Sequence, residues 1–387
     1  MATPLSLYIH FPWCIEKCPY CDFNSHPKRG ELPEQDYLQA LIDDLRADAP
    51  LASGRTIDTV FIGGGTPSLM QPATIAAVLQ AADELVGLST DAEITMEANP
   101  GAIEHHSFEG YLQAGVNRLS LGVQSFCNAH LQRLGRVHDA AAAFSAFAAA
   151  RAAGFDNINL DVMYGLPGQR LDEALADIDC AIELAPEHLS HYHLTMEQGT
   201  AFGRQPPGDL PDDDTTWEML AGAQKKLAAA GFGRYEVSAY AKAGHECRHN
   251  LNYWRYGDYL GVGAGAHGKL TDASGHIIRT IKKNKPALYQ QQPEQSRIGI
   301  SGDDARFEFM LNNLRLTGGF SVAQLAERCG SAGSVVMRQI QAACEKGLLE
   351  QADSDTFRPT ELGMRFLDDL QALFLPPEAG ESAQNPS

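Results

Sequence analysis

The chain of 387 residues is long enough for one large α/β domain and a smaller one, and its 44% hydrophobic residues can supply the cores. A formal charge of −19 argues against nucleic acid as a main partner, because phosphate binding depends on lysine and arginine. No apolar run reaches the ~18 residues of a membrane span and no secretory signal is recognisable, so we expect a cytoplasmic protein that meets membranes only through partners.

A cysteine-rich loop follows the first predicted strand. Cys14, Cys18 and Cys21 form a C-x3-C-x2-C run that can converge on one inorganic centre without long-range folding. Thiolates favour zinc or iron–sulfur clusters, but structural zinc normally takes four protein ligands, and position 23 is Phe23. Three ligands on a [4Fe–4S] cluster leave one iron open for a ligand that is not protein. A zinc site and three buried core cysteines are the alternatives. The eight cysteines of the chain do not indicate a disulfide framework in a protein of this size.

Short β-rich segments alternate with longer helical ones through the first half of the chain, which is the pattern of a parallel sheet with crossover helices. The predicted strands span residues 5–10, 57–62, 92–97, 117–122, 157–162 and 188–195. The predicted helices span residues 34–49, 72–86, 106–114, 139–153 and 172–184. Six such units make six-eighths of a TIM barrel, so we predict an open, curved (β/α)6 sheet with its site at the carboxyl ends of the strands.

The conspicuous polar and glycine-rich positions all follow predicted strands. They are the cysteine loop after the first strand, Gly63-Gly64-Gly65-Thr66-Pro67 after the second, Glu97 at the end of the third, Gln124 after the fourth and Asp161 at the end of the fifth. Glycine lets the backbone approach a ligand closely, and Arg136 would suit a carboxylate as a fixed cation. Each position alone could be a turn, a cap or a surface residue, but their place on one face favours a binding site.

After the sixth strand the pattern changes. A Pro/Gly/Asp-rich connector over residues 203–214 ends in a predicted helix N-cap before a helix at 215–230, and residues 234–238 are predicted as a strand. The stretch from His245 to Trp254 is unusual in composition, with residues 245–249 interpreted as extended, and a glycine-rich loop follows at 257–268. The basic residues of the next stretch are expected to form a solvated surface rather than a basic pocket: Arg279, Lys282, Lys283 and Lys285.

The C-terminal part is predicted to be a winged-helix-like α+β module. Its predicted elements are helices at 303–316, 321–328 and 335–346, a hairpin within 348–360 and a last helix at 361–373. Few basic residues favour a packing or substrate-covering role over DNA binding. We divide the chain into a barrel at 1–205, an extension at 206–300, the winged-helix-like domain at 301–374 and a disordered tail at 375–387.

Five motifs in this order resemble the coproporphyrinogen-oxidase-like branch of the radical S-adenosylmethionine (SAM) superfamily, over residues 5–370. They are the cysteine loop, Gly-Gly-Gly-Thr-Pro, Glu-Ala-Asn-Pro, Gly-Val-Gln-Ser-Phe and Asp-Val-Met-Tyr-Gly-Leu-Pro-Gly-Gln. The resemblance implies that Cys14, Cys18 and Cys21 are the metal ligands of a [4Fe–4S] cluster. It also implies a SAM site lined by Tyr8, Tyr20, Gly64, Gly65, Thr66, Glu97, Gln124, Arg136 and Asp161, with Arg133 as the alternative cation.

Two subgroups of that branch lead to different functions. The oxygen-independent coproporphyrinogen III oxidases, which convert two propionates to vinyls, have a fourth cysteine where this chain has Phe23 and a longer N-terminal extension, and both departures argue against oxidase activity. The heme-chaperone subgroup carries His-Asn-x-x-Tyr-Trp, present here from His249 to Trp254. Imidazole is a standard ligand of heme iron, and aromatic rings pack against a porphyrin. This resemblance implies a protein that binds heme through His249 and passes it to acceptor proteins.

Several alternatives stay open at this point. His245 or Cys247 could replace His249 as heme ligand, because alternate residues of an extended segment share a face, and the three could instead bind zinc. A protein-interaction module with a vestigial cluster is a third reading of the whole chain. Binding and cleavage of SAM are both compatible with the sequence, and cleavage would need an electron donor as a further partner.

Overall fold

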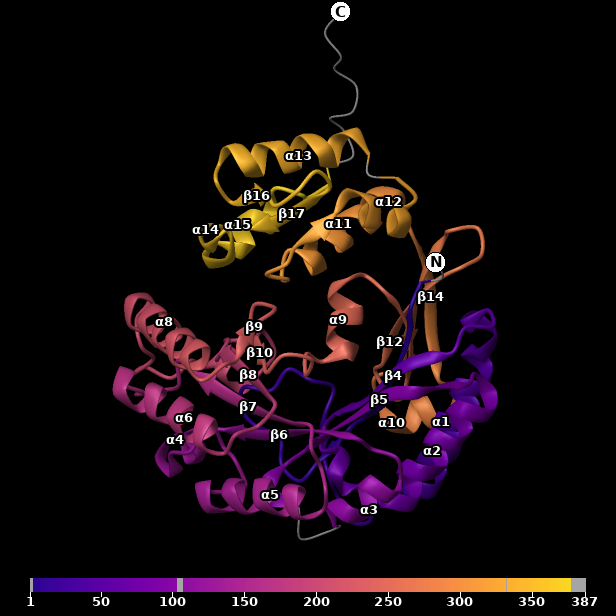
Figure 1. The fold of residues 1–387 in the computed structure, drawn as a ribbon. Helices are drawn as coiled ribbons and strands as arrows, with labels where there is room; N and C mark the ends of the chain where they lie inside the picture. Colours follow the sequence, from indigo (N-terminus) through magenta and orange to yellow (C-terminus); the bar gives the residue numbers. More distant parts are fainter. Residues whose placement is uncertain (1–2, 103–106, 332, 377–387) are drawn as a thin grey trace, which may run out of the picture.

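The computed structural model describes residues 3–102, 107–331 and 333–376. Its centre is one curved sheet of 12 strands in the order β14-β13-β12-β11-β1-β4-β5-β6-β7-β8-β10-β9, with helices on its outer, convex side (Figure 1). The strands from β11 to β8 run parallel to one another: β11 (Asp258–Val262), β1 (Leu5–Phe11), β4 (Ile57–Gly64), β5 (Leu88–Ala98), β6 (Arg118–Gln124), β7 (Ile158–Tyr164) and β8 (His188–His193). The sheet stays open because β11 pairs with β12 and β8 with β10.

The six strands predicted from the sequence are all present, which confirms the α/β class with a partial barrel. The helices that follow them are α1 (Glu34–Asp48), α2 (Pro72–Leu85), α3 (Phe108–Gln113), α4 (Asn128–Arg133), α5 (Ala140–Ala152) and α6 (Leu171–Glu183). The start of the predicted helix at 106–114 lies outside the described residues. The alanine-rich α5 shows how local sequence sets the bounds: the Asp139 carboxylate accepts a hydrogen bond from the Ala142 N–H at 2.8 Å, and Gly154 leaves the helix with φ 101°.

The seventh parallel strand, β11, corrects the prediction of a glycine-rich loop at 257–268. The glycines are there because strands approach closely: a Cβ on Gly261 would lie 1.9 Å from the His267 carbonyl oxygen. Antiparallel strands continue the sheet on that side, namely β12 (His267–Thr271), β13 (Ile277–Lys282) and β14 (Glu294–Ile300). At the other edge the predicted strand at 234–238 is wrong, since β9 covers Gly233–Arg234 and β10 covers Ala239–Ala241.

The segment between β10 and β11 also differs from its prediction. The last two of the residues interpreted as extended begin a short helix, α9 (Arg248–Trp254), which lies inside the curve of the sheet (Figure 1). The remaining helices of this half are α7 (Ala201–Arg204), α8 (Asp213–Ala229) and α10 (Pro286–Gln291). Helix α8 begins two residues earlier than predicted because the Asp212 side chain caps it, accepting from the Thr215 N–H at 2.8 Å.

The C-terminal module has the predicted helices and hairpin and packs around its own core, with Phe309, Phe320 and Leu325 buried. Its elements are α11 (Gly302–Asn313), β15 (Phe320–Ser321), α12 (Val322–Cys329), α13 (Ser334–Glu345), β16 (Leu349–Gln351), β17 (Thr356–Pro359), α14 (Glu361–Arg365) and α15 (Leu367–Ala372). The predicted last helix is two helices, because Phe366 leaves helical geometry at φ −112° and ψ 50°. Tyr256, in the turn after α9, joins this core.

The predicted boundaries at residues 205, 300 and 374 remain a proposal. Residues 206–300 contribute β9 to β14 to the same sheet as the barrel strands, so the first two segments share one framework. Most of the tail predicted as disordered, residues 377–387, lies outside the described residues.

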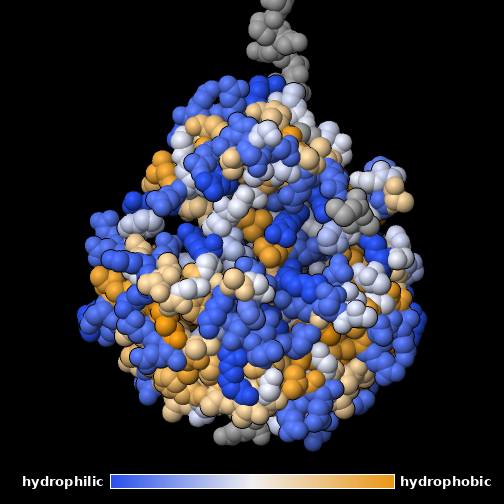
Figure 2. All heavy atoms as spheres, in the orientation of Figure 1, coloured by the Kyte–Doolittle hydropathy of each residue, from blue (hydrophilic) through white to orange (hydrophobic). Residues whose placement is uncertain are grey.

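The surface in Figure 2 is mostly hydrophilic, with a recess between the C-terminal module and the barrel rim. Among the described residues, no helix has the length and apolar character needed to cross a membrane.

The prediction of a solvated basic surface is wrong for Lys282, at the end of β13, whereas Lys283 and Lys285 do reach the surface. Lys282 is 1% exposed, and its ammonium group lies 2.5 Å from Asp44 and 2.6 Å from Asp48, both buried on α1. Replacing Lys282 with alanine leaves the buried Asp44 without its cation and Asp48 with Arg297 alone, at 3.0 Å, and we expect a loss of about 3–5 kcal/mol in the free energy of unfolding. Urea denaturation measures it. Lys283→Ala is the control, since this lysine contacts the Gln292 side chain at the surface. Equal losses in both variants would contradict the expectation.

Candidate functional site

A cavity of about 460 Å³ lies at the carboxyl ends of the parallel strands. Its wall includes the ends of β4, β6 and β8 and the loop between β2 (Trp13–Cys14) and β3 (His26–Pro27). The structure brings together here all the predicted cofactor residues except Tyr8 and His249. Those on the wall are Cys14, Cys18, Tyr20, Cys21, Gly64, Gly65, Thr66, Glu97, Gln124, Arg136 and Asp161.

The cysteine loop is held by its own backbone. The Cys21 N–H donates to the Cys18 carbonyl at 3.2 Å, and the Lys17 ammonium donates to the Phe23 carbonyl at 2.9 Å. Cys14, Cys18 and Cys21 are all free thiols. Burial raises the pKa of the Cys14 and Cys21 thiols, so a cationic partner is needed to hold them as thiolates. Three thiol donors on one cavity wall fit an iron–sulfur cluster as metal ligands.

The triple-glycine turn at the end of β4 packs tightly against the strand that carries the cysteine loop. Gly64 has φ 114°, and a Cβ there would lie 2.5 Å from the His10 ring. A Cβ on Gly65 would lie 2.4 Å from the Trp13 carbonyl oxygen. Both positions therefore require glycine, and the turn exposes backbone groups on the cavity wall.

Two carboxyl groups lie on the same wall. Glu97 accepts a hydrogen bond from the Gly64 N–H at 3.0 Å, and burial, followed by the negative charge of Asp161, raises its pKa to about 8. Asp161 accepts from the Ser120 hydroxyl and the Asn159 amide, each at 2.9 Å, while burial raises its pKa. A cation brought between these carboxyl groups would favour their ionised forms. The pair is therefore suited to an ammonium group or to ribose hydroxyls.

Gln124 and Arg136 complete this side of the cavity. Gln124 has φ 68°, which is uncommon for a residue with a side chain, and its amide oxygen accepts from the Tyr192 hydroxyl at 2.8 Å. Arg136 donates to the Gly122 carbonyl at 2.9 Å and to the Cys18 sulfur at 3.5 Å. The alternative cation, Arg133, does not line the cavity; its guanidinium lies 2.6 Å from the Asp209 carboxylate. Arg136 is therefore the guanidinium available to a carboxylate in the cavity.

Tyr8 and His249 lie elsewhere in the barrel. The Tyr8 hydroxyl is 2.9 Å from the His10 Nδ1. His249 is 1% exposed, its Nδ1 is 2.9 Å from the Thr59 hydroxyl, and its ring packs against Phe61 and Tyr253 with centroids 5.2 and 4.7 Å apart. Burial lowers its pKa to about 3, so the imidazole is neutral, and its Nε2 has no partner among the described residues. His249 therefore does not line the cavity in this structure.

The neighbouring alternatives of the sequence are also placed by α9. The Cys247 thiol donates to Glu93 at 3.6 Å, and the same carboxylate accepts from the backbone N–H groups of Arg248 and His249. Glu93 thus caps the N-terminus of α9 and fixes it to β5. Across the described parts of the chain, His245, Cys247 and His249 are not gathered around one metal-ion position.

Several residues of the cavity wall were not predicted from the sequence. Tyr192 lies near the end of the sixth predicted strand, where the rule used for the other strands would have found it. Asn250 and Trp254 belong to the quoted His-Asn-x-x-Tyr-Trp motif, and both line the cavity although His249 does not. A helical rather than extended reading of the motif would have placed these two residues, four apart, on one face.

Comparison with known proteins agrees with this geometry. The Radical SAM superfamily model matches residues 8–181, and the HemN C-terminal domain model matches residues 300–366. The chain is 48% identical to "Heme chaperone HemW" of Escherichia coli (strain K12) over 96% of this chain and 98% of that protein. It is 46% identical to "Heme chaperone HemW" of Haemophilus influenzae over 97% and 99% of the two chains. The fold matches that of coproporphyrinogen III oxidase (HemN) from Escherichia coli with a TM-score of 0.80 and 23% identity, covering 96% and 90% of the chains.

Proposed function

The chain belongs to the HemW family of the radical SAM superfamily, and we propose that it is a heme chaperone that binds heme and passes it to acceptor proteins. The observation that carries this proposal is the 48% identity that extends over nearly the whole length of a protein named heme chaperone. Its place of action is proposed to be the cytoplasm, with membranes approached only through partner proteins.

The cavity is proposed to hold the cofactors that this superfamily implies. Cys14, Cys18 and Cys21 would ligate a [4Fe–4S] cluster. Once reduced by a donor protein, that cluster would supply one electron to SAM. Arg136 would bind the SAM carboxylate, and the glycine turn at Gly64 would present its backbone to the amino group. The other proposed contacts with SAM are Tyr8, Tyr20, Gly65, Thr66, Glu97, Gln124 and Asp161.

His249 stays our predicted heme ligand, with the condition that α9 shifts to uncover it. Its neutral imidazole and free Nε2 suit iron coordination, and its burial argues for a structural role until heme arrives. Asn250 and Trp254 already line the cavity, so the motif contributes to the proposed heme site in either case.

Heme titration of the anaerobically purified protein, followed by the Soret band, tests the function and the ligand together. We expect saturable binding by the wild type. Binding by His249→Ala should be at least roughly tenfold weaker, because the variant lacks one ligand to the heme iron. Added imidazole should restore the wild-type spectrum, because it can replace a missing ligand but not a missing packing contact.

His188→Ala is the matched control for this titration. His188 is also 1% exposed, is held by Asn159 and Tyr235, and does not line the cavity. Equal weakening in both variants, with no rescue by imidazole, would assign His249 a packing role. Absence of heme binding by the wild type would remove the proposed function. Formation of protoporphyrinogen from coproporphyrinogen III with SAM and reductant would favour the oxidase instead.

A further inference from the structure

A second cavity lies behind α9, between the sheet and the C-terminal module, with a volume of about 230 Å³. Its wall is formed by polar and aromatic side chains: Tyr253, Trp254, Tyr259, Lys269, Arg279 and Asn312. This volume is too small for a macrocycle and suits a small polar group. None of the residues assigned to the cluster or to SAM lies on this wall.

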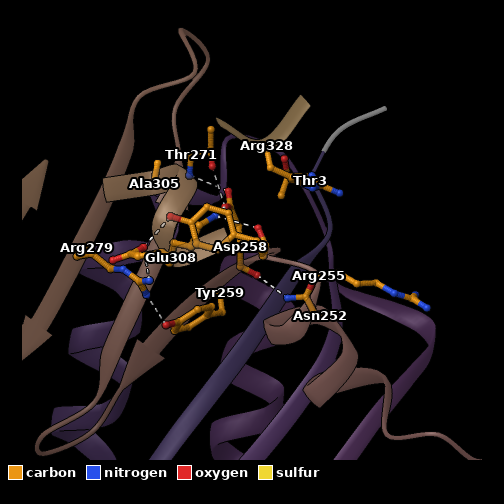
Figure 3. A network of polar contacts seen from close by, with 12 residues as sticks. Thr3, Asn252, Arg255, Asp258, Tyr259, Thr271, Arg279, Ala305, Glu308 and Arg328 are labelled. Carbon is orange, nitrogen blue, oxygen red and sulfur yellow. Dashed lines mark hydrogen bonds and ion pairs between the residues drawn. The ribbon is translucent and has the colours of Figure 1, made fainter. Parts of the chain in front are cut away.

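Two cations face this cavity, and the residues described on its wall include no carboxylate. Lys269 is 1% exposed and lies 2.8 Å from Asp258, while Arg279 lies 2.7 Å from Glu308. Arg279 also donates to the Tyr259 hydroxyl at 2.6 Å (Figure 3). The two acids therefore hold the cations from behind. Such backing fixes the positions of the cations without removing all of their hydrogen-bonding capacity.

Trp254 lines both cavities, so the two adjoin at its ring. Its indole N–H is buried and has no acceptor among the described residues. The guanidinium of Arg315 lies over the indole ring, 4.3 Å from its centroid, which holds the ring in place. An acceptor group that arrives with a ligand would satisfy this N–H.

We propose that the small cavity is a carboxylate subsite for a porphyrin whose macrocycle lies beside Asn250 and Trp254, in the part of the large cavity not assigned to the cluster and SAM. This inference rests on the proposed heme binding. The ring of Trp254 packs against the macrocycle, and a propionate carboxylate accepts hydrogen bonds from the Trp254 indole and from Arg279. A planar guanidinium held by Glu308 matches a planar carboxylate. The propionate thereby orients the heme relative to α9.

Heme and its dimethyl ester, in which both propionates lack their charge, test this subsite. We expect the full-length wild type to bind heme about 10–100-fold more tightly than the ester, as for a charge-assisted hydrogen-bonded group. Trp254→Phe keeps an aromatic ring but removes the N–H donor, so this preference should fall at least about threefold. Arg279→Gln should lower it further, because it removes the charge.

Trp217→Phe is the matched control, since Trp217 also lies under an arginine, Arg365, 4.3 Å from its ring centroid, but lines neither cavity. It should keep the wild-type preference. Equal wild-type affinities for heme and ester would overturn the subsite and leave heme binding intact. An unchanged preference in both Trp254→Phe and Arg279→Gln would overturn it as well. Failure of the wild type to bind heme would instead remove the proposed function beneath it.

Discussion

Alanine at Cys18 is expected to abolish the iron–sulfur cluster and, with it, SAM binding. Cys14, Cys18 and Cys21 supply the thiol donors on the cavity wall, and the loop is too short to bring in a replacement. Loss of an outer-shell partner alone usually costs 10–100-fold in metal affinity, so loss of a direct ligand should exceed that range. We expect iron and sulfide near zero per chain and SAM affinity lowered at least about 100-fold.

Iron and sulfide analysis of anaerobically reconstituted protein, with equilibrium dialysis of SAM, gives the comparison. Cys180→Ala is the control, because Cys180 lies on α6 and does not line the cavity. Retention of a full cluster by Cys18→Ala would show that the ligand set is wrong. Loss of the cluster in Cys180→Ala as well would indicate general instability instead of a missing ligand.

The affinity for SAM is expected to rise with pH between 6 and 8. Burial, and then the charge of Asp161, raises the pKa of Glu97 to about 8, so its carboxyl group is mostly neutral at pH 6. If the ionised form binds SAM, the competent fraction falls about tenfold for each pH unit below that pKa. We therefore expect binding roughly 50-fold tighter at pH 8 than at pH 6, because half of the carboxyl groups are ionised at the pKa, with the affinity levelling off above pH 8.

Isothermal titration of SAM into wild type and Glu97→Gln isolates this effect. The amino group of SAM titrates in the same range, but it does so equally with both proteins, so only the difference between the two slopes reports on Glu97. Glutamine keeps the shape without the proton, and the variant should lose the steeper dependence. Parallel slopes would show that Glu97 does not bind SAM in its charged form.

The barrel was predictable because its signals are local. Strand β1 and helix α5 show their period and caps in the sequence, and the carboxyl-end rule placed Glu97 and Asp161 on one wall. Long-range contacts decided the rest. Strand β11 contains Gly261 and lies between Gly257 and Gly263, and it pairs with β1 from about 250 residues away, which no local pattern reports. Lys282 was predicted to lie on the surface because its neighbours in the sequence are basic, but Asp44 and Asp48 of α1 bind it in the interior.

The motif from His249 to Trp254 illustrates the same limit at a single helix. Its residue types suggested heme binding, but the segment was expected to be extended and is helical. Nothing in the sequence shows that Glu93 caps α9. Reading the segment as extended put alternate residues on one face. The helix instead sends His249 into the barrel and presents Asn250 and Trp254 to the cavity.

The place of β1 between β4 and β11 has a consequence for synthesis on the ribosome. The strand that leads into the cysteine loop gains one neighbour after some 50 residues but the other only when residues 258–262 emerge. At about 5–20 residues per second, that edge stays unpaired for roughly 10–50 s. Nascent chains should therefore keep the cysteine loop accessible during this interval, and the site should close only as the last third of the protein is made.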